Sequence, residues 1–157
     1  MSGLKFDKRE LGNLEYSLDR EMLATDRRGG YMSTTIVCCN TRKYHGLMVA
    51  PIDQSDRTYV LLSSLDETLI QHDQSFNLAL HRFEGVYEPR GHKYITDFEY
   101  TPTPTITYRV GGAVLRKELL WIHKRTQLMI RYTLVDAHSE TTLRLRPMLA
   151  FRDKHSL

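Results

Sequence analysis

Alternation of apolar and polar residues in the last third of the chain constrains the fold more than any other feature. Residues 127–136 place apolar side chains at every second position, beginning with Leu128 and Ile130. Residues 141–151 repeat the pattern after a polar turn at residues 137–140. A period of two is typical of antiparallel strands with one face against a core. These segments therefore predict two such strands.

Other apolar or β-branched runs extend this prediction over most of the chain. The pair Gly111–Gly112 separates two of these runs and is a strong signal for a two-residue hairpin. Ser63–Ser64 marks a bend within another run. The predicted strands are residues 34–39, 46–51, 58–70, 76–83, 94–100, 105–110 and 113–123.

Helical signals are confined to the N-terminal region. Residues 7–14 could form one or two turns, with Asp7 as the N-cap and Glu10 at the capping-box position. The sequence therefore predicts an all-β protein with at most a short N-terminal helix. We expect an antiparallel β-sandwich or a large curved double sheet, and a barrel is the alternative architecture.

Length and composition exclude several classes of protein. A chain of 157 residues suits one domain and can bury a core without disulfides or metal. The longest apolar run, residues 47–52, is far shorter than the roughly 20 residues that span a bilayer. Lys plus Arg number 22 against 19 Asp plus Glu, and this excess is spread out. We therefore expect neither a membrane nor a nucleic acid as partner.

The two cysteines indicate a cellular compartment rather than a site. Cys38 and Cys39 are adjacent, so in an extended segment they would point to opposite faces and remain reduced thiols. Residues 1–10 contain no apolar region of a signal peptide. Together these features predict a cytoplasmic protein. No Cys or His pair has zinc-site spacing, so no metal is predicted.

The sequence offers no catalytic constellation. Glycoside hydrolysis requires two carboxyl groups that face each other. Asp66 and Glu67 are neighbours on a predicted strand, so their side chains diverge. Asp97 and Glu99 share a face, which we interpret as a solvated strand face. Nucleotide-binding glycine loops are also absent, so we predict no catalytic residues and no cofactor.

A polar cluster at residues 40–46 is the strongest candidate for binding. Arg42, Tyr44 and His45 supply planar donors and a ring face between two apolar strands. Such groups bind sugar hydroxyls and stack on pyranose rings. The alternative is structural: Arg42 pairs with an acid such as Asp66, and Tyr44 packs at a strand end.

Several blocks of sequence resemble one enzyme family. The specific block is Asn-Thr-Arg-Lys-Tyr-His-Gly-Leu at residues 40–47, supported by residues 23–35, 61–68, 86–89 and 146–155. From about residue 16 to residue 155 the chain resembles the N-terminal domain of bacterial and archaeal glycogen debranching enzymes of the amylo-α-1,6-glucosidase type.

This resemblance implies a fold and a context. In the family the N-terminal domain is a β-supersandwich that precedes an (α/α)6 barrel, and the barrel hydrolyses the α-1,6 branch linkage. Residues 1–157 would then be a single sandwich domain, a catalytically inactive fragment of a longer chain. The expected partners are an α-glucan, such as glycogen or a maltooligosaccharide, and the protein's own C-terminal catalytic domain.

The resemblance also nominates the residues nearest the barrel or the glucan. Two alternatives remain open: a free-standing carbohydrate-binding module, and a structural domain that docks the barrel without touching sugar. A free-standing module would expose Trp platforms, but Trp121 shares its predicted face with Leu115 and Leu119. Strand surface left uncovered by the barrel predicts a homodimer. The nominated residues are Arg42, Tyr44, His45, Asp66, Glu67, Arg152, Asp153 and His155.

Overall fold

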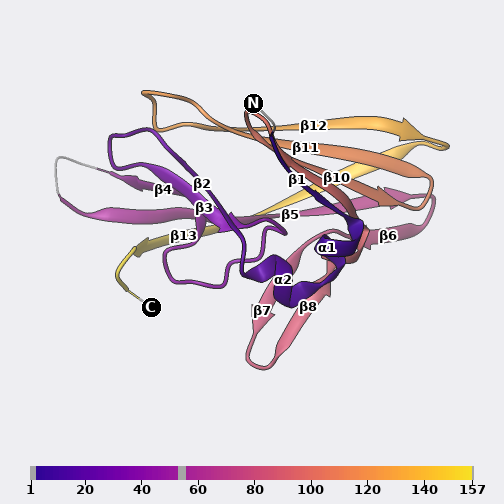
Figure 1. Ribbon diagram of the computed structural model, residues 1–157, viewed down its shortest axis with the longest axis horizontal. Coiled ribbons are helices and arrows are strands. Elements are labelled where there is room, and N and C mark those ends of the chain that lie inside the picture. Colours follow the sequence, from indigo (N-terminus) through magenta and orange to yellow (C-terminus); the bar gives the residue numbers. More distant parts are fainter. Residues whose placement is uncertain (1–2, 53–55, 157) are drawn as a thin grey trace.

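Two antiparallel sheets stacked face to face form the body of the molecule (Figure 1). The computed structural model describes residues 3–52 and 56–156, and all structural statements refer to them. The first sheet has the order β1 (Leu4–Asp7), β9 (Ile95–Tyr100), β10 (Pro104–Val110), β11 (Ala113–Trp121) and β12 (Leu128–Ala137). The expected antiparallel sandwich is therefore confirmed.

The second sheet contains the longest strands. Its order is β13 (Thr141–Asp153), β5 (Thr58–Gln71), β4 (Gly46–Pro51), β3 (Tyr31–Thr35) and β2 (Glu21–Thr25), and β6 (Gln74–Asn77) also pairs with β5. A separate hairpin of β7 (Leu80–Phe83) and β8 (Val86–Arg90) projects from the body (Figure 1). The short 3-10 helix η1 (Gly91–Tyr94) follows it.

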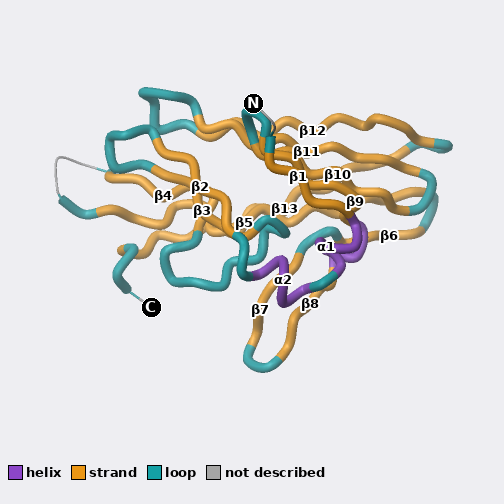
Figure 2. The backbone as a smooth tube through the Cα atoms, viewed as in Figure 1, coloured by secondary structure: helices purple, strands orange, loops and turns teal. Residues whose placement is uncertain are grey.

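The helical part is small and lies beside this hairpin (Figure 2). Helix α1 (Lys8–Gly12) begins at the predicted capping box: the Asp7 carboxylate accepts the backbone N–H of Arg9 at 2.8 Å, and Glu10 Oε2 accepts that of Asp7 at 3.0 Å. A second helix, α2 (Leu14–Leu18), follows because the Asn13 side chain caps Tyr16 N–H.

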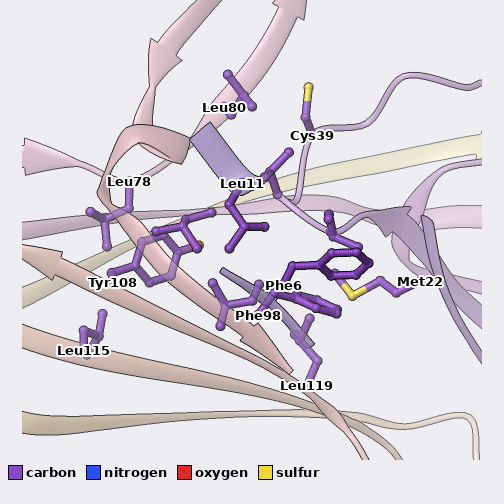
Figure 3. Close-up of a cluster of buried hydrophobic side chains, with 14 of the residues drawn as sticks. Phe6, Leu11, Met22, Cys39, Leu78, Leu80, Phe98, Tyr108, Leu115 and Leu119 are labelled. Atoms are coloured by element: carbon purple, nitrogen blue, oxygen red, sulfur yellow. The ribbon is translucent and has the colours of Figure 1, made fainter. Parts of the chain in front are cut away.

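The inner faces of the two sheets form one apolar core (Figure 3). Strand β11 shows why: every second residue is buried, ending at Trp121, so one face of the strand meets the opposite sheet. Trp121 is a core residue, as predicted. The rings of Phe6 and Phe98 meet with centroids 6.0 Å apart, and Leu11 of α1 is fully buried beside them.

Two predicted strands are wrong in their boundaries. The segment 34–39 was expected to be one strand, but β3 ends at Thr35. The Thr35 hydroxyl accepts the backbone N–H of Cys39, which closes a turn. Cys38 has a positive φ of 57° and is not extended, although both thiols are free. Segment 76–83 divides into β6 and β7 in different sheets, because Asn77 Oδ1 accepts Ala79 N–H between them.

The sandwich is open along one side. Among the described residues, β12 and β13 each pair with one neighbour only, although the turn at residues 138–140 links them. Register places Leu134 opposite the buried Leu115, and Leu145 opposite the buried Glu67. Their side chains share the inner faces of the sheets yet are 47% and 44% exposed. Farther along β13, Phe151 is 74% exposed.

This open side predicts self-association of the chain, because uncovered apolar side chains beside unpaired strand edges favour pairing between molecules. The double substitution Leu145→Lys and Leu149→Lys should shift dimers to monomers in light scattering at high concentration. The matched control Leu120→Lys replaces an exposed leucine on β11, which has a neighbour on both sides, and should leave the dimer fraction unchanged. A wild-type chain that stays monomeric would contradict the prediction.

Candidate functional site

Most of the nominated residues gather at one end of the second sheet. The C-terminal segment after β13 lies against the loop after β3, beside the label C in Figure 1. Arg152 donates from Nη2 to the Lys43 carbonyl at 2.8 Å, and Tyr44 Oη lies 3.4 Å from His155 Nδ1. We call these two segments, residues 40–45 and 152–156, the rim. The rim brings together residues separated by more than 100 positions.

The loop half of the rim is tied to the second sheet. Asn40 accepts a hydrogen bond from the Thr34 hydroxyl at 2.8 Å and donates to the Ser63 carbonyl at 2.8 Å, so it bridges β3 and β5. Tyr31 on β3 donates its hydroxyl to the Tyr44 carbonyl at 3.0 Å. The loop is therefore positioned by three side-chain contacts, and the Tyr44 ring remains exposed.

His45 is buried beneath this loop and organises it. Its Nδ1 accepts the backbone N–H of Thr41 at 3.0 Å and that of Arg42 at 3.4 Å. The neutral ring then carries its proton on Nε2, which lies 3.3 Å from Glu21 Oε1. Burial lowers the pKa of His45 and outweighs the opposing attraction of Glu21. His45 is thus a positioning group and not a surface contact.

Arg42 pairs with an acid, as the structural alternative predicted, but the acid is Glu21 on β2 and not Asp66. Glu21 lies far from the loop in sequence, and only the pairing of β2 with β3 brings it there. Sequence reasoning missed Glu21 because a single acid at a strand start carries no pattern. The Arg42 side chain stays largely exposed despite this ion pair.

Asp66 and Glu67 are not part of the rim, although both line a small cavity that Asn40, the first residue of the rim, also lines. Their side chains leave β5 on opposite faces, as predicted for adjacent strand residues. Asp66 contacts His81 Nε2 at 2.9 Å on one face. Glu67 points into the sandwich, where it pairs with Lys117 and accepts the Tyr132 hydroxyl at 2.6 Å. Both residues are buried and join strands of the fold.

The Glu67–Lys117 pair is a buried electrostatic contact between the two sheets. Lys117 is 1% exposed and Glu67 is 2% exposed. Burial alone would lower the pKa of Lys117, but the attraction of Glu67 outweighs it and the pKa is raised. Burial, together with the Glu67 charge, raises the pKa of Tyr132, so its hydroxyl remains a donor. A lysine between Leu115 and Leu119 on an alternating strand was the signal that could have revealed this pair.

Asp97 and Glu99, the other acidic pair considered from the sequence, lie on a solvated strand face, as predicted. Asp97 and Glu99 lie on the outer face of the first sheet, where Glu99 pairs with Lys5 at 2.9 Å. Across residues 3–52 and 56–156 there is no group of three or more metal-ligating side chains. Over the same ranges, no helix has the length and apolarity needed to cross a bilayer.

Substituting Lys117 by Met should destabilise the chain by about 3–5 kcal/mol, because the Glu67 carboxylate would stay buried without its cation. Chemical denaturation measures this change. The double variant with Glu67→Leu should recover most of the loss, because no uncompensated charge remains. As a control, Lys5→Met removes an exposed ion pair and should leave stability nearly unchanged. Equal losses for the single and double variants would contradict the interpretation.

Acid should weaken the fold through His45. The folded pKa lies below the ordinary value of 6.5, so between these two values the unfolded chain binds a proton that the folded chain does not. The free energy of unfolding should therefore fall as pH drops below about 6.5 and level off below the folded pKa. In denaturation series from pH 8 to 5, His45→Gln should reduce this dependence, whereas the exposed-site variant His123→Gln should preserve it.

Comparisons with known proteins agree with the resemblance noted from the sequence blocks. The family model described as "Glycogen debranching enzyme N terminal" matches residues 20–157. No curated protein and no solved structure matches the chain. The match includes both segments of the rim and all strands from β2 to β13. Since it spans far more than half of the sequence, the chain belongs to the family of glycogen debranching enzyme N-terminal domains.

Proposed function

We propose that this domain positions the α-glucan of a glycogen debranching enzyme and packs against a catalytic domain that follows it in a longer chain. The domain itself would be non-catalytic. The observation that carries the proposal is the rim, where the family-specific loop and the end of β13 meet through Arg152 and Lys43.

The chemistry of the rim supports contact with sugar. Tyr44 offers an exposed ring, and its edge-to-face contact with His155, at 83° between ring planes, holds that ring in place. Arg42 and Arg152 add guanidinium donors. Planar donors beside an aromatic face suit the hydroxyls and C–H faces of glucose units.

A second role, docking of the catalytic domain, is favoured by a separate observation. Phe151 precedes the rim, is 74% exposed, and stacks on Tyr59 with ring centroids 5.0 Å apart. Leu149 on the same strand is 77% exposed. Apolar side chains bordered by polar ones are the usual anatomy of a protein interface. We therefore assign glucan contact to the rim and domain contact to Leu149 and Phe151.

The rim is tested in the complete enzyme that the proposal requires. Tyr44→Ala and Arg152→Ala should each lower the kcat/KM of branch-point hydrolysis about fivefold to tenfold, because each removes one interaction with the positioned glucan. Arg116→Ala, on the outer face of the first sheet, is the matched control and should retain activity. Wild-type kinetics in both rim variants would refute the positioning role.

Docking predicts a different outcome for the neighbouring residues. Phe151→Ser should loosen the domain from the catalytic domain, which limited proteolysis would detect as faster cleavage between the two. Loss of solubility in the complete enzyme with an unchanged isolated domain would also support docking. Cleavage at the wild-type rate would contradict it.

A further inference from the structure

A groove of about 530 Å³ lies between α2, the loop half of the rim and the projecting β7–β8 hairpin. In Figure 1 the hairpin stands away from the two sheets next to α2. Thr41 and Arg42 line the groove, so it begins where the rim ends. Its volume falls within the usual range of small-molecule sites, about 300–1,000 Å³.

One wall of the groove is a cross-strand pair of the hairpin. Arg82 on β7 stands directly opposite Tyr87 on β8, so both side chains lie on the same face, and both line the groove. The next pair, Phe83 and Val86, lies on the other face of the hairpin. Tyr87 is half-buried against the core, which fixes its ring, whereas Arg82 is exposed.

The opposite wall is α2, which presents two chemical types. Leu14 and Leu18 are one helical turn apart and provide an apolar surface. Glu15 and the C-cap residue Asp19 have the same spacing and provide two exposed carboxylates. The groove therefore combines apolar side chains and a phenol ring with charged groups of both signs.

The charges of the groove argue against an anionic ligand. Arg42 and Arg82 are balanced by Glu15 and Asp19, and Arg42 is further neutralised by Glu21. A site for phosphate or another anion would instead have an uncompensated excess of cations. Apolar surface with planar donors and carboxylate acceptors matches a pyranose chain, whose C–H faces are apolar and whose edges carry hydroxyls.

We propose that this groove binds an uncharged maltooligosaccharide segment and continues the glucan path from the rim across the β7–β8 hairpin. The inference rests on the proposed function, because the family match supplies the α-glucan context. It adds Arg82, Tyr87, Glu15 and Asp19 as glucan contacts that the sequence blocks did not nominate. Tyr87 supplies the stacking ring, and the charged side chains bind hydroxyl groups.

The test is an NMR titration of the isotope-labelled chain with maltohexaose. Amide signals of residues 14–19, 41–42 and 82–87 should shift and saturate together at millimolar sugar. Inorganic phosphate should leave these signals in place and should not compete. Saturable shifts confined to other surfaces, an absence of shifts, or displacement of the sugar by phosphate would overturn the proposal.

Substitutions in the groove identify which side chains contribute to maltohexaose binding. Arg82→Ala should raise the maltohexaose dissociation constant about threefold to tenfold, the usual effect of losing one charged hydrogen-bond donor. Asp19→Asn should raise it as well, and Arg116→Ala should not. Tyr87→Ala should abolish detectable binding. Because Tyr87 also packs on the core, the thermal unfolding of the Tyr87→Ala variant is measured in parallel. If this variant does not fold, the affinities of Arg82→Ala and Asp19→Asn decide whether the groove binds the sugar.

This test separates the groove from the proposed function. If Tyr44→Ala and Arg152→Ala impair hydrolysis while maltohexaose leaves the groove signals unshifted, the proposed function stands and the groove is refuted. If maltohexaose shifts the groove signals while both rim variants hydrolyse normally, the groove is a glucan site and the positioning role of the rim is refuted.

Discussion

The buried contact of Glu67 with Lys117 and Tyr132 constrains how the two sheets face each other. Its members come from β5, β11 and β12, so a single contact joins the longest strand of one sheet to two strands of the other. Apolar side chains alone would tolerate several relative placements of the sheets. A buried ion pair tolerates few, since each charge is costly unless its partner is at hydrogen-bonding distance.

The position of β5 in turn sets the position of the rim. Strand β5 continues through Ser63–Ser64, where a bend was predicted, while both of its neighbours shift register opposite Leu62. The Ser63 carbonyl then holds Asn40, the first residue of the loop half of the rim. At the N-terminal end of β5, Tyr59 pairs with Asp153 of β13, and this pairing brings His155 to Tyr44. The surface to which we assign glucan contact thus follows from strand register.

Sequence patterns predicted what depends on local periodicity. The hairpin at Gly111–Gly112, the capping box of Asp7 and Glu10, and the burial of Trp121 are local consequences of backbone and side-chain geometry. Contacts between distant segments were beyond such patterns: Glu21 with Arg42 depends on sheet pairing, and the groove depends on a hairpin docked beside α2. Strands β1, β2 and β8 lay outside the predicted segments, since each has only four or five residues. Family resemblance nominated the rim, but it also nominated Asp66 and Glu67, which the structure places outside it.

The pairing of β5 with β13 has a consequence for how the chain is made. Gln71 on β5 pairs with Thr141 on β13, which is synthesised 70 residues later. Glu67 pairs with Lys117, which is synthesised 50 residues later. On the ribosome, the nascent chain therefore carries β5 as an unpaired edge with a carboxylate that has no cation. The two sheets of this domain therefore cannot complete their packing until β11 and β13 have both been synthesised.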